Sequence, residues 1–357
     1  MEIKLPLSVR IVIVLLLVSI IVWWMYLLQE ILILISFSIL FALLLFPLCN
    51  RLEKWKFPRT LAISVSLLVS TAIVAGLIVL VFMQIANFSD EFPTFQKKGT
   101  DMINHIQIWA SKNFHISRKK QVAEFRNHSL SLLQNSGTII TNFLSSMANS
   151  LSSAVLVPIL TFFFLLYRDF FRKFFYRVFG IKNRKRIDLV CLKIYKVVQG
   201  YLVGLMSVIL IVAVLNTIGL VALGIDYAIF FGTLAAFLLL IPYIGIMIGS
   251  LLPILLALIT KDSYLYAVGV AGVFLFVQFL EGNFITPHIV GSKVSVNPLA
   301  AMIGLVLGGQ LWGLSGLILA LPFIAIMKVI FDNVDALKPY GYLLGEAEVK
   351  DGGALLD

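Results

Sequence analysis

Four polar side chains in the C-terminal part of the chain are the first candidates for chemistry, because they interrupt a sequence that is otherwise strongly apolar. Glu281 and Asn283 follow one apolar run. His288 lies shortly after them, and Gln310 lies within the next run. A carboxylate in hydrocarbon is costly unless a cation or a proton compensates its charge. Amides offer donors and acceptors to a polar solute, and an imidazole changes its protonation near neutral pH. These four residues are predicted to bind a small polar solute, a proton or a sodium ion.

Each candidate also has a purely structural interpretation. Glu281 ends an apolar helix, where the helix dipole disfavours a negative charge. It is a functional carboxylate, an exposed interfacial residue or the ion-pair partner of Lys293. The amides of Asn283 and Gln310 can instead form hydrogen bonds between helices. No second histidine or carboxylate cluster lies near His288 in the sequence, so neither a metal site nor a cofactor is expected.

Two long apolar stretches flank these candidates, and glycine and proline interrupt both of them and the joint between them. Proline lacks a backbone donor and glycine weakens a helix, so each interruption loosens the helical hydrogen bonding. In hydrocarbon such freed backbone must be buried in protein or line a cavity, and pairs of broken segments point to a transport site. The glycines after residue 307 also permit close helix packing. The interrupting residues are Pro242, Gly245, Gly249, Pro253, Pro287, Pro298, Gly308, Gly309, Gly313, Gly316 and Pro322.

The composition assigns the chain to the membrane proteins. Of 357 residues, 60% are hydrophobic and 13% charged, with a mean hydropathy of +1.01, which is too apolar for one soluble core. We expect an all-α polytopic membrane protein with about six to eight transmembrane or re-entrant helices. The net charge of +10 comes from basic residues in short loops beside apolar spans, so nucleic acid is not an expected partner. An enzyme is not expected either, because the chain lacks a HExxH pair and the other patterns of intramembrane catalysis.

In chain order, the sequence divides into five segments. Residues 1–83 hold three N-terminal membrane helices, of which the first two are predicted to form a hairpin through a tight turn at Gln29 and Glu30. Residues 84–137 form an extracytoplasmic amphipathic helical section, and residues 138–198 hold the fourth span and a basic cytoplasmic section. Residues 199–331 form a C-terminal transport core, and residues 332–357 a cytoplasmic tail. Positive charge after the second and fourth spans places both termini in the cytoplasm.

Two arrangements of the broken stretches agree with this charge pattern. Residues 228–260 and 299–330 are re-entrant hairpins beside one true span near residues 264–280, or all three stretches cross the membrane fully. Both arrangements leave the C-terminus in the cytoplasm. The re-entrant arrangement is favoured, because both stretches are long and are interrupted near their middles.

An ordered series of residues in this core resembles a known family. The series comprises the Pro242 to Gly245 spacing, the step from Gln278 to Asn283 with Pro287 after it, the pair Asn297 and Pro298, and the glycines from Gly308 to Gly316. It is similar to the C-terminal core of the autoinducer-2 exporter (AI-2E) family of bacterial membrane permeases, over about residues 187–330. One departure is Gln199-Gly200-Tyr201, where family members usually carry an Arg-Gly-Gln-like step.

The resemblance implies a multi-pass, homo-oligomeric permease of the bacterial plasma (inner) membrane. It would export a small polar solute, with a proton or sodium gradient as the driving force. Family members have been linked to autoinducer export and to sodium/proton antiport, so a sodium/proton antiporter is one alternative. A membrane scaffold without transport is the other, because family membership does not fix the substrate.

The topology can be tested by labelling single cysteines in whole cells. The native cysteines, Cys49 and Cys191, are both predicted near the cytoplasm, so no disulfide is expected and both can be replaced by alanine. In that background we expect an impermeant thiol reagent to label Lys112→Cys from outside and to leave Lys182→Cys unlabelled. Labelling of Lys182→Cys but not of Lys112→Cys would overturn the scheme.

Overall fold

The computed structural model describes residues 6–79, 155–240, 244–291 and 295–346, with Met83, Lys97, Lys98 and Thr100 as isolated positions. Every regular element among these residues is helical, which confirms the all-α fold. Six of the described helices are long and apolar enough to cross a membrane by length and composition. The predicted section at residues 84–137 lies almost wholly outside the described residues, as do Pro242 and Lys293.

The chain forms two compact units, and each is assembled from segments that are distant in the sequence. The first unit comprises Met1–Leu67, Leu156–Val203 and Ser292–Asp357. The second comprises Leu68–Val155 and Gly204–Gly291. The long helix α7 (Arg184–Ala222) begins in the first unit and ends in the second.

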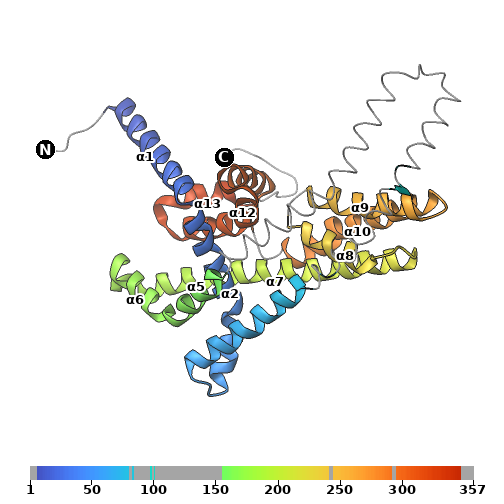
Figure 1. Ribbon diagram of the computed structural model, residues 1–357. Coiled ribbons are helices and arrows are strands. Elements are labelled where there is room, and N and C mark those ends of the chain that lie inside the picture. Colours follow the sequence, from blue (N-terminus) through green and yellow to red (C-terminus); the bar gives the residue numbers. More distant parts are fainter. Residues whose placement is uncertain are drawn as a thin grey trace, which may run out of the picture. The chain divides into compact units, whose positions relative to one another are not determined.

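The first unit opens with two helices joined end to end. Helix α1 (Leu7–Leu27) is followed by α2 (Gln29–Lys54), with Leu28 as the one residue between them (Figure 1). Gln29 and Glu30 belong to the first turn of α2, so the predicted tight turn and hairpin are wrong. The physical reason is that glutamine and glutamate favour helix, and no glycine or proline lies at this junction to reverse the chain.

After a short loop the chain continues with the helix Arg59–Val79, which begins in the first unit and passes into the second after Leu67. Helices α5 (Leu156–Leu166) and α6 (Arg168–Phe179) follow, separated only by Tyr167, and η1 (Ile181–Asn183) leads into α7. Side chains of α2, α5 and the helix Arg59–Val79 form a buried cluster around Cys49, Ile63 and Leu165. This cluster joins segments that lie about a hundred residues apart in the sequence.

Helix α12 (Pro298–Asn333) is a hairpin of two helices rather than one straight helix. Its backbone leaves helical geometry at Trp312 (φ −132°, ψ 18°) and Gly313 (φ 59°, ψ −136°), a combination that only glycine adopts readily. On either side of the turn the two arms touch, because a Cβ atom on Gly308 would lie 2.6 Å from the carbonyl oxygen of Gly316. The glycines therefore allow the backbones of the two arms to meet.

The two ends of this hairpin lie together. Asn297 caps the first arm by accepting a hydrogen bond from the amide of Ala300 (2.8 Å). Its side-chain amide donates to the carbonyls of Leu343 (2.7 Å) and Gly345 (2.9 Å). These carbonyls close α13 (Lys338–Leu344), which follows α12 after the short helix η4 (Asp335–Leu337). The start of α12 therefore lies against the end of α13.

The second unit contains a similar hairpin. Helices α8 (Ala228–Leu238) and α9 (Ile244–Thr260) pack so closely that a Cβ atom on Gly249 would lie 2.8 Å from both the Cα and the Cβ atoms of Ala235. Asp226, before α8, lies 3.9 Å from Lys261, after α9. Both broken stretches therefore form helical hairpins rather than single straight helices. Their re-entrant arrangement in the membrane stays a prediction.

The second unit continues with one long helical segment. It consists of α10 (Leu265–Leu280), the π-helix η2 (Glu281–Ile285) and α11 (Thr286–Ile289), which run on without a turn between them. Together they span 25 residues, or about 37 Å at the rise of a regular helix, so this segment is long enough to cross a bilayer.

Gly249→Ala tests how tightly the hairpin of α8 and α9 is packed. The added methyl group would press on the backbone of Ala235, and overpacking of this kind costs about 1–3 kcal/mol. We expect a lower melting temperature in detergent. The matched control is Gly272→Ala in α10, where a Cβ atom meets nothing within 4 Å and the gain in helix propensity is free to raise stability. Equal effects of the two substitutions would contradict close packing at Gly249.

Candidate functional site

The strongest candidate site is the carboxylate of Glu281, which lies at the junction of α10 and η2 and is only 9% exposed. Its Oε2 atom accepts a hydrogen bond from the side-chain amide of Gln278 at 2.9 Å. Its Oε1 atom accepts one from the hydroxyl of Thr286. Both donors are neutral, and the ion pairs among the described residues do not include Glu281. The carboxylate is thus hydrogen-bonded, but no cation within the described part of the chain forms an ion pair with it.

The local sequence explains why Thr286 reaches Glu281. Pro287 has no backbone N–H and its ring crowds the carbonyl four residues earlier, so a regular α-helix cannot pass through it undisturbed. The backbone widens by one residue into a π-helix, in which the N–H of Thr286 donates to the carbonyl of Glu281. This spacing brings the Thr286 side chain beneath the carboxylate. Single turns of π-helix occur frequently at functional sites.

Helix α7 covers this segment and runs antiparallel to it. Three glycine contacts fix the register: Gly269 lies against Leu223, Gly219 against Val273, and Gly204 against the carbonyl of Ile289. Apolar side chains of both helices fill the space between them. They include Val208, Ile209, Val212, Val277, Ile285 and Ile289. The carboxylate therefore lies beside a tightly packed apolar wall.

Asn216 adds a second buried polar group to the facing side of α7. It is 3% exposed and lies between Val212 and Leu220, one turn away on either side, which are both buried. Among the residues that the structure describes, its Oδ1 atom has no hydrogen-bond partner. Leaving a buried amide oxygen unpaired typically costs about 1–3 kcal/mol. The antiparallel register places Asn216 opposite residue 276, about one and a half helical turns from the level of Glu281.

The other predicted candidates do not join Glu281. Asn283 is exposed, and its side chain donates to the carbonyl of Phe279 at 2.9 Å. His288 is also exposed, with Nδ1 2.7 Å from the carbonyl oxygen of Phe284. Gln310 is exposed in the first arm of α12 and belongs to the first compact unit. The site thus forms around Glu281 with Gln278, Thr286 and α7.

Two expectations about Glu281 need correction. The interpretation as an exposed interfacial residue is wrong, because the side chain is buried. The helix-dipole argument is wrong too, because the helical backbone continues past Glu281 through η2 and α11 and leaves no free helix end there. Burial in an apolar surrounding, and not the dipole, is what makes this carboxylate costly.

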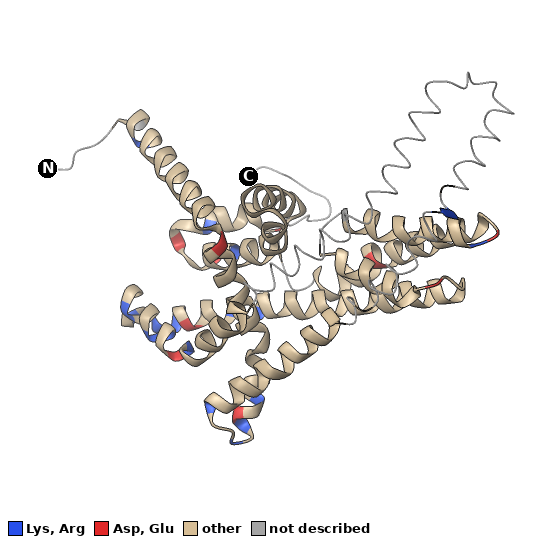
Figure 2. Cartoon of the chain, in the orientation of Figure 1, with Lys and Arg blue, Asp and Glu red and all other residues tan. Residues whose placement is uncertain are grey.

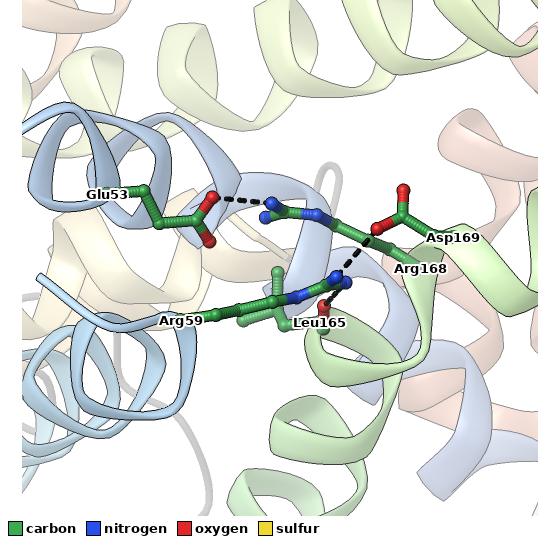
Figure 3. A network of polar contacts seen from close by, with 5 residues as sticks. All are labelled: Glu53, Arg59, Leu165, Arg168 and Asp169. Carbon is green, nitrogen blue, oxygen red and sulfur yellow. Dashed lines mark hydrogen bonds and ion pairs between the residues drawn. The ribbon is translucent and has the colours of Figure 1, made fainter. Parts of the chain in front are cut away.

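A different set of polar contacts lies in the first unit, and we call it the charged junction: Glu53, Arg59, Leu165, Arg168 and Asp169 (Figure 3). Arg168 donates to Glu53 and Arg59 to Asp169, both at 2.6 Å. Arg59 also donates to the carbonyl of Leu165 at 3.0 Å. The guanidinium of Arg168 lies 5.2 Å from the centre of the Phe46 ring. The charged junction ties the last turn of α2 and the start of the helix Arg59–Val79 to the boundary between α5 and α6.

The C-terminal residues join the start of α7 through a similar set of contacts. Arg186 donates to Asp335 (3.0 Å) and to the carbonyl of Asn333 (2.8 Å). The Lys338 ammonium, with Arg186 beside it, holds the pKa of the exposed Asp335 carboxyl below its ordinary value. With the charged junction, these contacts link segments that were all predicted on the cytoplasmic side. Figure 2 shows the same pattern, with helix bodies mostly tan and charges gathered near helix ends.

These features define a class. Long apolar helices, two glycine-lined helical hairpins and a buried carboxylate at a break in a spanning segment characterise a multi-pass membrane transport protein.

The comparisons with known proteins agree with this class. The sequence pattern of the AI-2E family transporters matches residues 11–336. The chain is 24% identical over 325 residues to the AI-2 transport protein TqsA of Escherichia coli (strain K12), covering 89% of this chain and 90% of TqsA. It is 28% identical over 302 residues to YrrI of Bacillus subtilis (strain 168), covering 82% of this chain and 83% of YrrI. The chain belongs to the AI-2E transporter family.

Thr286→Val tests the hydrogen bond to Glu281. The substitution keeps the shape of the side chain but removes the donor, so the buried Oε1 atom loses its partner and the protein should lose about 1–3 kcal/mol of stability. Thermal unfolding in detergent measures this loss. The control is Thr260→Val in α9, where the hydroxyl donates to a carbonyl of its own helix, that of Leu256. An equally small effect of both substitutions would show that the contact with Glu281 is not stabilising.

Proposed function

We propose that the protein is a secondary transporter that exports a small polar solute, with Glu281 as the group that couples transport to a proton or a sodium ion. The observation that carries this proposal is the buried carboxylate with two neutral donors and no neighbouring cation among the described residues. A negative charge in that setting is stabilised when a proton or a cation binds to it. Occupancy of Glu281 is then linked to the ion gradient.

The surroundings of Glu281 support a role in binding. Widening of the helix at η2 frees Thr286 to act as a ligand, because its hydroxyl oxygen keeps acceptor capacity while it donates to the carboxylate. Asn216, about one and a half turns away on the facing helix, has an amide oxygen with no partner among the described residues. Carboxylate, hydroxyl and amide oxygens are the ligands that hard cations prefer. The same groups can form hydrogen bonds with a polar solute.

The two hairpins support transport rather than a scaffold role. A scaffold has no need of stretches that interrupt their own helices and return to the side they came from. The close backbone contacts at Gly249 and between Gly308 and Gly316 leave smooth faces of small residues. Such faces permit packed helices to slide past one another, which is one way in which a transport pathway opens and closes.

The solute belongs to the chemical class that these groups recognise: small, polar and rich in hydroxyl or carbonyl groups. The relative TqsA is named for AI-2 transport, so autoinducer-2 is the first solute to test. We further propose that the protein is a homo-oligomer in the bacterial plasma membrane with both termini in the cytoplasm. The basic segments that meet at the charged junction and at Arg186 support this orientation.

Sodium/proton antiport without an organic solute is the second candidate function. It needs only the carboxylate at Glu281 and its oxygen neighbours, so the same site favours it. The two functions differ in one observable. In vesicles that contain no organic solute, an antiporter moves sodium in the direction opposite to the proton flow that an imposed gradient drives. A coupled exporter requires the solute.

Flux in reconstituted vesicles tests the role of Glu281. We expect Glu281→Gln to keep the fold and the oligomer size, because glutamine preserves the shape of the side chain. Its carbonyl oxygen can accept the hydrogen bond from Gln278, and its NH2 group can donate to the hydroxyl of Thr286. The substitution should abolish flux or its dependence on the imposed proton or sodium gradient. Glu30→Gln, which neutralises an exposed carboxylate in the first turn of α2, is the matched control and should transport normally.

The readouts separate a coupling role from a structural one. Transport by Glu281→Gln at the normal rate and with the normal gradient dependence would end the coupling hypothesis. A variant that unfolds or elutes at a different size would assign Glu281 to the packing of α7 on α10. Lys293→Ala is a further control. If Lys293→Ala unfolds while Glu281→Gln transports normally, the carboxylate is only a structural partner of that lysine.

A further inference from the structure

Helix α6 has an unusual distribution of side chains for a helix at the surface of a folded unit. Its sequence, RDFFRKFFYRVF, places aromatic and aliphatic residues on one face and charged residues with Tyr176 on the other. The apolar face consists of Phe170, Phe171, Phe174, Phe175, Val178 and Phe179. None of the residues of α6 is buried.

The polar face of α6 is the one that contacts the rest of the first unit. At its N-terminal end, Arg168 and Asp169 take part in the charged junction (Figure 3). In its middle, Arg172 donates to Asp188 of α7 at 2.8 Å, and the Tyr176 hydroxyl also donates to Asp188. The guanidinium of Arg184 lies 5.2 Å from the centre of the Tyr176 ring. These contacts hold α6 by its polar face.

Apart from Phe171, whose ring centre lies 5.7 Å from that of Phe164 in α5, the apolar face consequently points away from the unit that holds the helix. Phe170 is 64% exposed, Phe174 50%, Val178 56% and Phe179 60%. A soluble protein would turn such a face inward, because each exposed aromatic ring forfeits a large favourable burial. The ion pairs fix the opposite orientation, so the exposed face is a built feature of the structure.

We propose that α6 lies in the headgroup region of the membrane, with its phenylalanines in the acyl boundary and its basic residues on anionic phospholipid headgroups. Two observations select a lipid surface over a protein partner. First, α6 begins one residue after α5, a strongly apolar helix at the end of the predicted fourth span, so covalent continuity would keep α6 close to the bilayer. Second, α6 and the residues that follow it carry cations outside the ion pairs of the described residues: Lys173 and Arg177 on α6, and Lys182 and Lys185 just after it.

This composition is typical of interfacial helices. Aromatic side chains on one face and lysine or arginine on the other bind the headgroup boundary, and anionic lipid strengthens the binding. The long stems of lysine and arginine let their charges reach the headgroups while the helix axis lies deeper. Through the charged junction, lipid bound to α6 acts on the end of α2 and on the helix Arg59–Val79. The proposal does not depend on the ion or the solute that the protein transports.

Spin-label accessibility in nanodiscs tests the proposal with the full chain. Labels are placed at Phe174→Cys on the apolar face and at Lys173→Cys, its neighbour on the polar face, in a Cys49→Ala, Cys191→Ala background. In nanodiscs of equimolar phosphatidylcholine and phosphatidylglycerol, we expect the Phe174 label to collide several-fold more with oxygen than with a water-soluble nickel chelate. The Lys173 label should show the reverse preference. Phe170→Cys replaces Phe174→Cys if the latter fails to fold.

Lipid composition and charge provide the second arm. In nanodiscs of phosphatidylcholine alone, the oxygen preference of the Phe174 label should fall, and the combined Lys173→Glu, Arg177→Glu variant should show the same fall in the anionic nanodiscs. A Phe174 label that meets the nickel chelate freely in both lipids would place the face in water and overturn the proposal. A label shielded from oxygen and nickel alike would also overturn it, because a protein surface then covers the face.

Discussion

Backbone hydrogen bonding in hydrocarbon is the constraint on which this structure depends. Each interrupted helix frees donors or acceptors that water cannot reach, so every break needs a partner inside the protein. The first unit meets this need by bringing two breaks together. Met25 lies in the last turn of α1, where carbonyls lose their intrahelical donors. Its carbonyl accepts a hydrogen bond of 3.0 Å from the indole of Trp312, the residue at which α12 reverses.

The same need for hydrogen-bond partners applies at the candidate site, where it has a functional consequence. Pro287 removes a backbone donor, and the chain responds by inserting a π-helix instead of ending the helix. The inserted residue rotates Thr286 toward Glu281, and the carboxylate gains a partner that a regular helix would not supply. The π-helix interrupts the spanning segment, and this interruption brings Thr286 and Glu281 together. This links the breaks in the sequence directly to the candidate site.

The sequence alone predicted the parts of this structure that local patterns decide. Apolar runs predicted the helices, and glycine and proline marked where the broken stretches turn back at Gly313 and pack at Gly249. The end-to-end junction at Leu28 was missed, because charge and polarity at Gln29 and Glu30 resemble a turn while their intrinsic preference is helical. Glu281 was predicted as a site residue because a glutamate at the end of an apolar run is visible in the sequence. Its hydrogen-bond partners were harder to predict.

Those partners depend on contacts that a linear pattern does not encode. Thr286 lies five residues from Glu281, a spacing that becomes a contact only in a π-helix, although the proline after it was a usable warning. Asn216 lies in a long apolar run on another helix, and its position opposite α10 follows from the register that Gly204, Gly219 and Gly269 set. The side chains of Asn283 and His288 are polar and near in sequence, yet each bonds a carbonyl of its own helix. Proximity in sequence was therefore a poor guide to the composition of the site.

The distribution of charge across the two units explains why Glu281 is set apart from the other acids. Glu53, Asp169 and Asp335 lie near helix ends and pair with arginine or lysine, where solvent is close and the pairs serve to join segments. A lysine or arginine beside Glu281 would balance the charge of the carboxylate permanently. A transported ion would then have to displace that side chain before it could bind. The partners of Glu281 among the described residues are neutral donors, which orient the carboxylate without cancelling its charge. On the function proposed above, that difference keeps binding reversible, because a transport site must hold its ion firmly enough to capture it and weakly enough to release it.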